Sequence, residues 1–228
     1  MVRIHWHRLG LRCQKPCYQA LAQDKTKVKQ FLDKAFKDIQ EVAQEMNADV
    51  AFEDESWIQA NTRSGRTGGL GGQPPNITVT DRRSGFPVRS MVTAAGALMY
   101  KTTRETMESA TDIQFLEKVL SNRTRPFIVS ADQAAYHTSG EGKDFIEKHH
   151  QQIRLFFLPP HAPELNPDEQ VWNEITHRQL EKQPIKNRKD FKTRVDAARK
   201  ALKECKEKVK SFFQLKDTKY ANLKPSMA

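Results

Sequence analysis

Residues 158–176 read LPPHAPELNPDEQVWNEIT, and this stretch decides how the rest of the chain is interpreted. Its four prolines keep the backbone extended or turned, so a helix can begin only near Pro167. Glu169 then falls in a first helical turn, where unpaired backbone amides and the positive end of the helix dipole favour a carboxylate. An ordinary capping acid would occupy the same position, so the local pattern alone leaves the role of Glu169 open.

Two further acids are expected where apolar strands end. Alternation in DVAFEDE, residues 49–55, predicts a strand whose apolar face ends in Asp54. The apolar run FIV, residues 127–129, predicts a doubly covered central strand that ends near Asp132. A lone carboxylate on such an apolar face is costly to bury, so it either lies at an exposed strand end or meets a cation.

The remaining elements follow from hydrophobic periodicity. Further strands are expected at 89–94 and 98–102, joined as a hairpin, and at 153–158. Helices are expected at 25–47, about 113–120, 142–150, from the opening motif to about 180, and as one long basic helix over 187–210.

Length and composition indicate one large domain, or one domain with a short accessory segment, with a polyanionic partner. The 228 residues carry 38 Lys and Arg against 28 Asp and Glu, a formal net charge of +10, which favours nucleic acid over a merely soluble basic protein. Three cysteines form no disulfide framework, and an N-terminal zinc site from His5, His7, Cys13 and Cys17 lacks a second paired cluster. Without a membrane span or secretion signal, a cytoplasmic location is expected.

Asp54, Asp132 and Glu169 form the candidate chemical constellation. In an open mixed sheet, neighbouring strand ends and helix N-termini share one edge, which is where such folds place their sites. Converging carboxylates raise one another's pKa values, so together they predict hard divalent cations, Mg²⁺ with Mn²⁺ as a substitute. Two such ions activate an attacking oxygen and stabilise the leaving oxygen of a phosphodiester.

Three blocks of the sequence resemble a known family. LPPHAPELNPDEQVW (158–172) resembles the third catalytic block of mariner-like bacterial insertion-sequence transposases of the DDE superfamily, FEDESW (52–57) the first and IVSADQAAYH (128–137) the second. Thirty-six residues separate Asp132 from Glu169, close to the family's short second interval. The resemblance covers about residues 9–180, including a linker-like LGLRCQKP at its start.

The resemblance implies a ribonuclease H-like α/β fold, a mixed sheet flanked by helices as in retroviral integrases, with a basic C-terminal helix. It assigns Asp54, Asp132 and Glu169 as the catalytic ligands of two divalent cations. Glu55 ranks below Asp54 because alternation turns it to the other sheet face.

Within the third block, Asn166 is expected as the helix N-cap and Pro167 as the first helical residue. Trp172 is expected in the core. Gln133 and His161 replace an Asn and a Tyr that the family often has at these places.

The expected domains are an N-terminal linker and helix (1–46), a DDE catalytic domain (47–182) and a basic helical C-terminal extension (183–228). The family's end-reading helix-turn-helix domain is not expected within these residues. Basic and imidazole side chains around the site are candidate DNA contacts, although a solvated helix face or a capped strand end would explain several of them equally well. They are Arg63 and Arg66 in a Gly-rich loop, His137, His161, Lys186, Arg188 and Lys189.

The resemblance implies a transposase catalytic subunit that cuts phosphodiesters at transposon ends and joins them to target DNA, in DNA transposition, recombination and integration. Its expected partners are the transposon ends and target DNA, a second copy of the chain, and an upstream helix-turn-helix subunit, with no membrane. The protein would then be prokaryotic and nucleoid-associated when bound. The alternative is a catalytically silent DNA-binding or oligomerising remnant that regulates a full-length transposase, and a third reading is a host nuclease of the same fold.

Overall fold

Strand β1 (Asp49–Gln59) is the middle strand of a five-stranded sheet of order β3-β2-β1-β4-β5. The structure is a computed structural model that describes residues 20–59, 85–102, 109–132, 139–176, 185 and 187–223. On one side, β1 pairs antiparallel with β2 (Gly85–Thr93), which pairs antiparallel with β3 (Leu98–Thr102). On the other, β1, β4 (Phe127–Ala131) and β5 (Ile153–Phe157) run parallel. The sheet is therefore mixed, as predicted.

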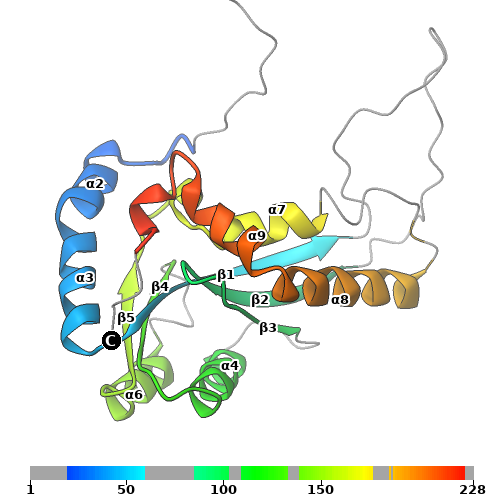
Figure 1. Cartoon of the computed structure of the whole chain (residues 1–228), viewed down its shortest axis with the longest axis horizontal. Helices are drawn as coiled ribbons and strands as arrows, with labels where there is room; N and C mark the ends of the chain where they lie inside the picture. Colours follow the sequence, from blue (N-terminus) through cyan, green and yellow to red (C-terminus); the bar gives the residue numbers. More distant parts are fainter. Residues whose placement is uncertain are drawn as a thin grey trace, which may run out of the picture.

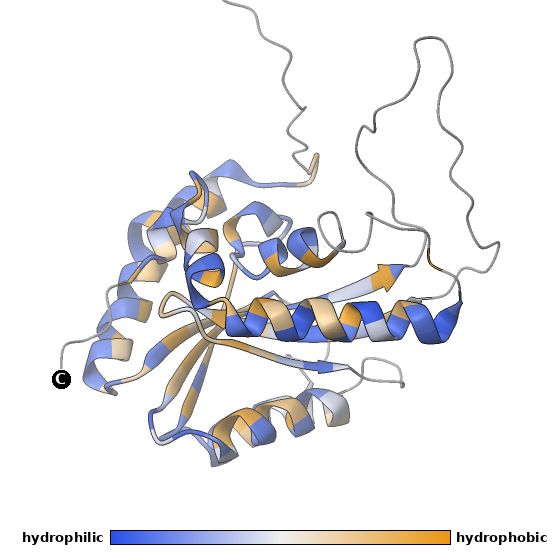
Figure 2. Ribbon diagram, turned by 45° about the vertical axis from the view of Figure 1, so that its right-hand side comes forward, coloured by the Kyte–Doolittle hydropathy of each residue, from blue (hydrophilic) through white to orange (hydrophobic). Residues whose placement is uncertain are grey.

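Helices cover both faces of this sheet (Figure 1). Helices α4 (Ser109–Ser121) and α6 (Gly140–Lys148) lie on one face, where Phe115 packs in a cluster with strand residues such as Phe127. The other face is covered by α3 (Phe36–Glu45), α7 (Glu169–Asn173), α8 (Arg188–Glu204) and α9 (Lys206–Ser211). Hydrophobic residues follow the strands and the inner helix faces, while the outer helix faces are hydrophilic (Figure 2). This two-sided burial explains why the strand at 127–131 reads as a continuous apolar run.

The first helical stretch is confirmed, with one irregularity. Asp24 caps α2 (Lys25–Gln30), since its side chain accepts hydrogen bonds from the amides of Thr26 and Lys27 at 2.8 and 3.3 Å. A π-helical segment, η1 (Phe31–Ala35), then joins α2 to α3. Its Phe31 is buried in the core.

The C-terminal elements differ from the single long helix that periodicity predicts, and that prediction is wrong. The chain breaks at Cys205, whose backbone angles are φ −96° and ψ 72°, so α8 and α9 are separate helices. The turn brings Val209 and Phe213 to zero exposure in the core. Two 3₁₀ turns follow, η4 (Phe212–Gln214) and η5 (Lys219–Ala221).

Core packing joins the two segments that flank the predicted catalytic domain. Phe36 on α3 and Tyr220 on η5 meet edge to face, with ring centroids 4.7 Å apart, and both rings contact Phe52 of β1. Helices from both flanks therefore complete the core of the sheet. The predicted domain boundaries after 46 and after 182 stay predictions.

The hairpin between β2 and β3 is confirmed and turns at Gly96. This glycine has φ +88°, a conformation that other residues rarely adopt. A Cβ there would also lie 2.8 Å from the backbone oxygen of Lys206. The turn thus allows close approach of α9 to the sheet.

Several sequence predictions concern residues outside the described part of the chain. They include the zinc alternative at His5, His7, Cys13 and Cys17, the Gly-rich loop at 61–75, and the residues Arg63, Arg66, Gln133, His137 and Lys186. Among the helices that the structure does describe, none has the length and apolar character needed to cross a membrane.

Candidate active site

Asp54 and Asp132 occupy equivalent places on two adjacent parallel strands. The last aligned pair of β1 and β4 is Phe52 with Ser130, and each acid lies two positions further along its own strand direction. Because side chains two apart share a face and paired residues share a side, both carboxylates belong to the same face at the same edge. The pairing register thus brings together two acids that are 78 residues apart in sequence.

The prediction that Asp54 ends its strand is wrong. Strand β1 continues to Gln59, paired only with β2 as far as Gly85. Parallel pairing with β4 stops at Phe52, however, so Asp54 still lies where the sheet opens. Asp132, by contrast, follows the end of β4 directly and is exposed.

Glu169 is the first residue of α7 and so lies in the first helical turn, as the proline pattern predicts. A 3₁₀ turn, η2 (Pro163–Leu165), and Asn166 precede it. The side chain of Asn166 accepts a hydrogen bond from the amide of Asp168 at 3.0 Å and donates one to the carbonyl of Glu53 at 2.9 Å. This bridge ties the start of α7 to strand β1 beside Asp54.

The predicted N-cap and first residue of α7 are wrong. Helix α7 begins at Glu169 with Asp168 at the N-cap position, so Asn166 is not its N-cap and Pro167 is not its first residue. Asn166 has an extended backbone, φ −86° and ψ 110°, because it closes η2. Its amide still binds a backbone N–H at the helix start, while its other hydrogen bond reaches the sheet.

Asp168 is a fourth acid at this place, and no sequence pattern predicted it. Its side chain is fully buried and accepts a 2.5 Å hydrogen bond from the hydroxyl of Ser90 on β2. Ser90 lies opposite Asp54 in the register. An acid between a proline and Glu169 has no pattern of its own, so only the β1 and β2 pairing could have indicated this contact.

The negative charges of these acids shift one another's pKa values. Burial first, and then the charges of Glu169 and Asp132, raise the pKa of Asp54 well above its usual range. Burial and then the charge of Asp132 raise the pKa of Glu169. Burial and then the charge of Asp54 raise the pKa of Asp168 well above its usual range. Three separate segments of the chain therefore concentrate negative charge in one place.

These shifts have a definite consequence for stability. Because the folded-state pKa values are raised, the chain is stabilised below the ordinary carboxyl pKa, and that stability is lost as the pH rises through the raised values. The ionised cluster is thus a net cost to the fold. A bound cation would offset this cost, since opposite charge favours the ionised form.

Trp172 touches the cluster from within the core. Its indole Nε1 donates a hydrogen bond to Asp54 Oδ2 at 3.0 Å, and this bond lowers the pKa of Asp54 against the larger effects. The ring itself is 4% exposed. The prediction that Trp172 is a core residue is confirmed, and the indole N–H has a polar partner as well.

The other face of β1 carries an ion-pair cluster centred on Arg89 of β2. The buried guanidinium pairs with Glu53, Glu55 and, from α4, Asp112. Glu55 thus points away from Asp54, as alternation predicts. Asp54 and this cluster lie on opposite sides of the same strand.

The candidate ligands suit hard divalent cations, although no complete metal-binding cluster is formed in the part of the chain that the structure describes. Within those residues, no three His, Cys, Asp or Glu side chains already stand close enough to form one. Asp54, Asp132 and Glu169 offer only carboxylate oxygens, which Mg²⁺ and Mn²⁺ prefer. Their mutual effect on pKa fits a place built for positive charge, and the three-carboxylate metal site stays a prediction.

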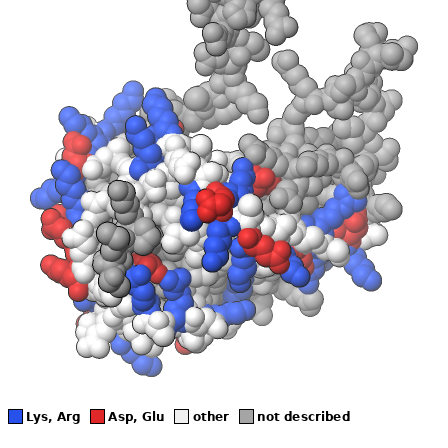
Figure 3. All heavy atoms as spheres, viewed as in Figure 1, with Lys and Arg blue, Asp and Glu red and all other residues white. Residues whose placement is uncertain are grey.

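Three of the seven candidate DNA contacts are described. His161 is exposed with φ 59°, and its carbonyl accepts a 3.2 Å hydrogen bond from the side chain of Gln23. Arg188 and Lys189 are exposed at the start of α8. Lys and Arg side chains on the visible face are interspersed with Asp and Glu (Figure 3). This distribution leaves the DNA-contacting role of these residues a prediction.

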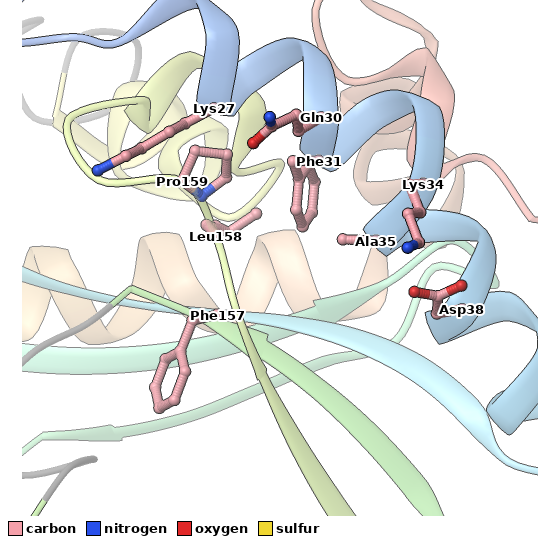
Figure 4. Close-up of a pocket in the computed structure, with 9 residues that line it drawn as sticks. All are labelled: Lys27, Gln30, Phe31, Lys34, Ala35, Asp38, Phe157, Leu158 and Pro159. Carbon is pink, nitrogen blue, oxygen red and sulfur yellow. The ribbon is translucent and has the colours of Figure 1, made fainter.

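A hollow of about 500 Å³ lies beside the end of β5 (Figure 4). Lys27 and Lys34 line it from the first helical stretch, and Leu158 and Pro159 line it from the opening motif. The amide of Leu158 bonds to the carbonyl of Ala131, the residue before Asp132. The hollow is therefore close to the acidic edge in the fold, but none of the three acids lines it.

The fold and the candidate site together define the class of protein to which the chain belongs. A mixed sheet of order β3-β2-β1-β4-β5, with acids just beyond the last paired residues of two adjacent parallel strands and at a following helix start, is a ribonuclease H-like α/β domain. A family model described as DDE superfamily endonuclease matches residues 49–192, more than half of the chain. The chain belongs to this family of endonucleases.

Solved structures show the same fold at low sequence identity. A pre-cleavage Mos1 transpososome matches with a TM-score of 0.66 and 15% identity, over 96% of this chain and 70% of that one. The Mos1 mariner paired end complex with Mn gives 0.65 and 14%, over 96% and 70%. The catalytic domain of Mos1 mariner transposase gives 0.57 and 12%, over 90% and 98%. No curated protein matches the chain significantly.

Proposed function

We propose that the chain is the catalytic part of a DDE transposase that cuts DNA at transposon ends and joins the freed ends to target DNA. Family membership supports the nuclease class. The similar Mos1 structures include a paired end complex and a strand transfer complex, which supports DNA as the substrate and a paired assembly of two copies. The net charge of +10 agrees with a polyanionic partner.

One observation carries the proposal. Asp54, Asp132 and Glu169 come from three separate segments, and the charges of Glu169 and Asp132 raise the pKa of Asp54. A chain gains nothing for folding from such a cluster unless it binds a cation. We assign these three carboxylates as ligands of two divalent cations, Mg²⁺ or Mn²⁺.

The chemistry follows from that assignment. When bound, the cations supply activation of the attacking oxygen and stabilisation of the leaving oxygen. In the first step, water attacks the phosphorus of a phosphodiester and the bond to the 3′ oxygen breaks, which leaves a 3′ hydroxyl and a 5′ phosphate. In the second, the 3′ hydroxyl attacks a target phosphodiester and displaces its 3′ oxygen. Asp54 holds one edge of the site from β1, together with Asp132 just after the end of β4, and Glu169 holds the other from α7.

Metal removal is the test of this proposal. Purified protein, together with the expected upstream helix-turn-helix subunit, is incubated with duplex DNA that carries the element's own ends, with Mg²⁺ or with a chelator. We expect strand nicks at those ends with Mg²⁺, and none with the chelator, because the carboxylates alone cannot stabilise the leaving oxygen. Gel analysis of end-labelled strands measures the nicks.

The same experiment separates the competing readings. Salt-sensitive DNA binding without nicks in Mg²⁺ or Mn²⁺ would contradict the proposal and favour the silent regulatory remnant. Nicks without preference for element ends, and without joined products, would favour a host nuclease of the same fold.

A further inference from the structure

We propose that Trp172 is a positioning residue that holds the carboxylate of Asp54 in the orientation needed for cation binding. This inference rests on the proposed function, because it takes Asp54 as a ligand. Its basis is the 3.0 Å hydrogen bond from indole Nε1 to Asp54 Oδ2. The indole N–H only donates, and a charged acceptor makes such a bond stronger than a neutral one.

The backbone position of Asp54 does not by itself fix the orientation of its carboxylate. Pairing with β2 fixes its backbone opposite Ser90, but rotation about the side-chain bonds can still turn the carboxylate. The negative charges of Glu169 and Asp132 act on the same carboxylate. The hydrogen bond from Trp172 opposes that rotation, and we assign the other oxygen, Oδ1, to the cation.

Trp172 is itself held rigidly. Its ring is 4% exposed and packs in the main core with Val171 and Ile175 of the same segment. The start of α7 is tied to β1 by the Asn166 hydrogen bond to the Glu53 carbonyl, and to β2 by the Ser90 hydrogen bond to Asp168. A donor fixed by packing and by a second set of hydrogen bonds can define the geometry of a ligand.

The proposed role of Trp172 explains its spacing from Glu169 in the motif. Trp172 follows Glu169 by three residues on α7, and residues three apart lie on neighbouring parts of one helix face. A single helical turn thus carries one proposed ligand and the group that holds another. Any shift of α7 moves Glu169 and the Asp54 carboxylate together, which keeps their relative placement.

The test compares Trp172→Phe with Ile175→Val. Both changes remove a small part of the same buried surface, but only the first removes the hydrogen-bond donor. We expect Trp172→Phe to weaken Mn²⁺ binding about tenfold by calorimetry, in the range typical for lost partners of metal ligands. We expect Ile175→Val to keep the wild-type affinity. Equal Mn²⁺ affinity of the two variants would overturn the positioning role.

A second readout needs neither metal nor activity. The chain has three tryptophans, and the indole N–H resonance that is missing from Trp172→Phe identifies Trp172 by NMR. In metal-free Asp54→Asn, which retains the tryptophan, we expect this resonance to move upfield, because a neutral amide oxygen accepts a weaker hydrogen bond. If Trp172→Phe fails to fold, Trp6→Phe and Trp57→Phe identify the other two resonances, and the Trp172 resonance follows by elimination. An unchanged Trp172 resonance in Asp54→Asn would overturn the proposal.

The outcomes also separate this inference from the proposed function. If Asp54→Asn keeps wild-type Mn²⁺ affinity, the ligand role of Asp54 fails and the positioning role fails with it. If Asp54→Asn weakens Mn²⁺ binding and Trp172→Phe does not, only the positioning role fails.

Discussion

Asp132→Asn is expected to abolish DNA cleavage while leaving the fold intact. The substitution keeps the size of the side chain and removes one charged oxygen donor from the proposed cation site. If that donor contributes about 4 kcal/mol to the stabilisation of the transition state, cleavage slows about a thousandfold. Because the Asp132 side chain is exposed and its charge raises the pKa values of Asp54 and Glu169, the free energy of unfolding of the metal-free protein should not decrease.

Asp144→Asn is the matched control for this variant. Asp144 is an exposed aspartate on α6, on the face of the sheet away from α7. Its replacement makes the same change in net charge, so it corrects for altered attraction to DNA. Single-turnover nicking by both variants is measured in Mg²⁺ at one salt concentration. Equal rates for Asp132→Asn and Asp144→Asn would remove Asp132 from the site.

Arg89→Met is expected to cause the largest loss of stability. The side chain of Arg89 is 3% exposed, and it pairs with Glu53 and Asp112, whose side chains are 1% and 3% exposed. Removing the guanidinium leaves these carboxylates and Glu55 facing one another away from water. Loss of one partner from a buried ion pair costs about 3–5 kcal/mol. This is a large share of the 5–15 kcal/mol that is typical of a domain.

Urea unfolding followed by circular dichroism measures this effect. Arg194→Met is the control, because Arg194 forms a half-exposed pair with Asp190 four residues earlier on α8. Such a pair contributes only about 0.5 kcal/mol. A loss for Arg89→Met as small as that of the control would mean that the cluster does not stabilise β1.

The parts of the fold that local patterns could predict are those in which one physical rule dominates. Because the strand at 127–131 is buried on both faces, its sequence is a continuous apolar run that could be recognised as a strand. The prolines before Glu169 indicated that the helix begins only after the proline-rich segment, as observed. The strand at Asp54 was predicted too short, because its last four residues, 56–59, are held by pairing with β2 across 25 residues of chain outside the described part. Cross-strand pairing of that kind leaves little local signal.

The residues of the candidate site likewise fall into those that local sequence patterns predicted and those that depend on contacts between distant segments. Asp54 and Asp132 were found because each follows an apolar run, and Glu169 because it opens a helix just after a strand. All three also fall in recognisable sequence blocks. Asp168 and Ser90 were missed, since their contact joins the motif to β2 and depends on the register. The donor role of Trp172 was hidden for a similar reason. Periodicity shows that the ring is buried, but only the fold shows which atom its N–H meets.

The central claim is that three carboxylates from separate segments form one cation site, and a crystal soaked in Mn²⁺ tests it most directly. Anomalous scattering locates the metal without reference to activity. The account predicts metal peaks bounded by the carboxylates of Asp54, Asp132 and Glu169, and their loss in Asp132→Asn. Mn²⁺ bound elsewhere in a chain that still cuts DNA, with no peak among these three acids, would contradict it.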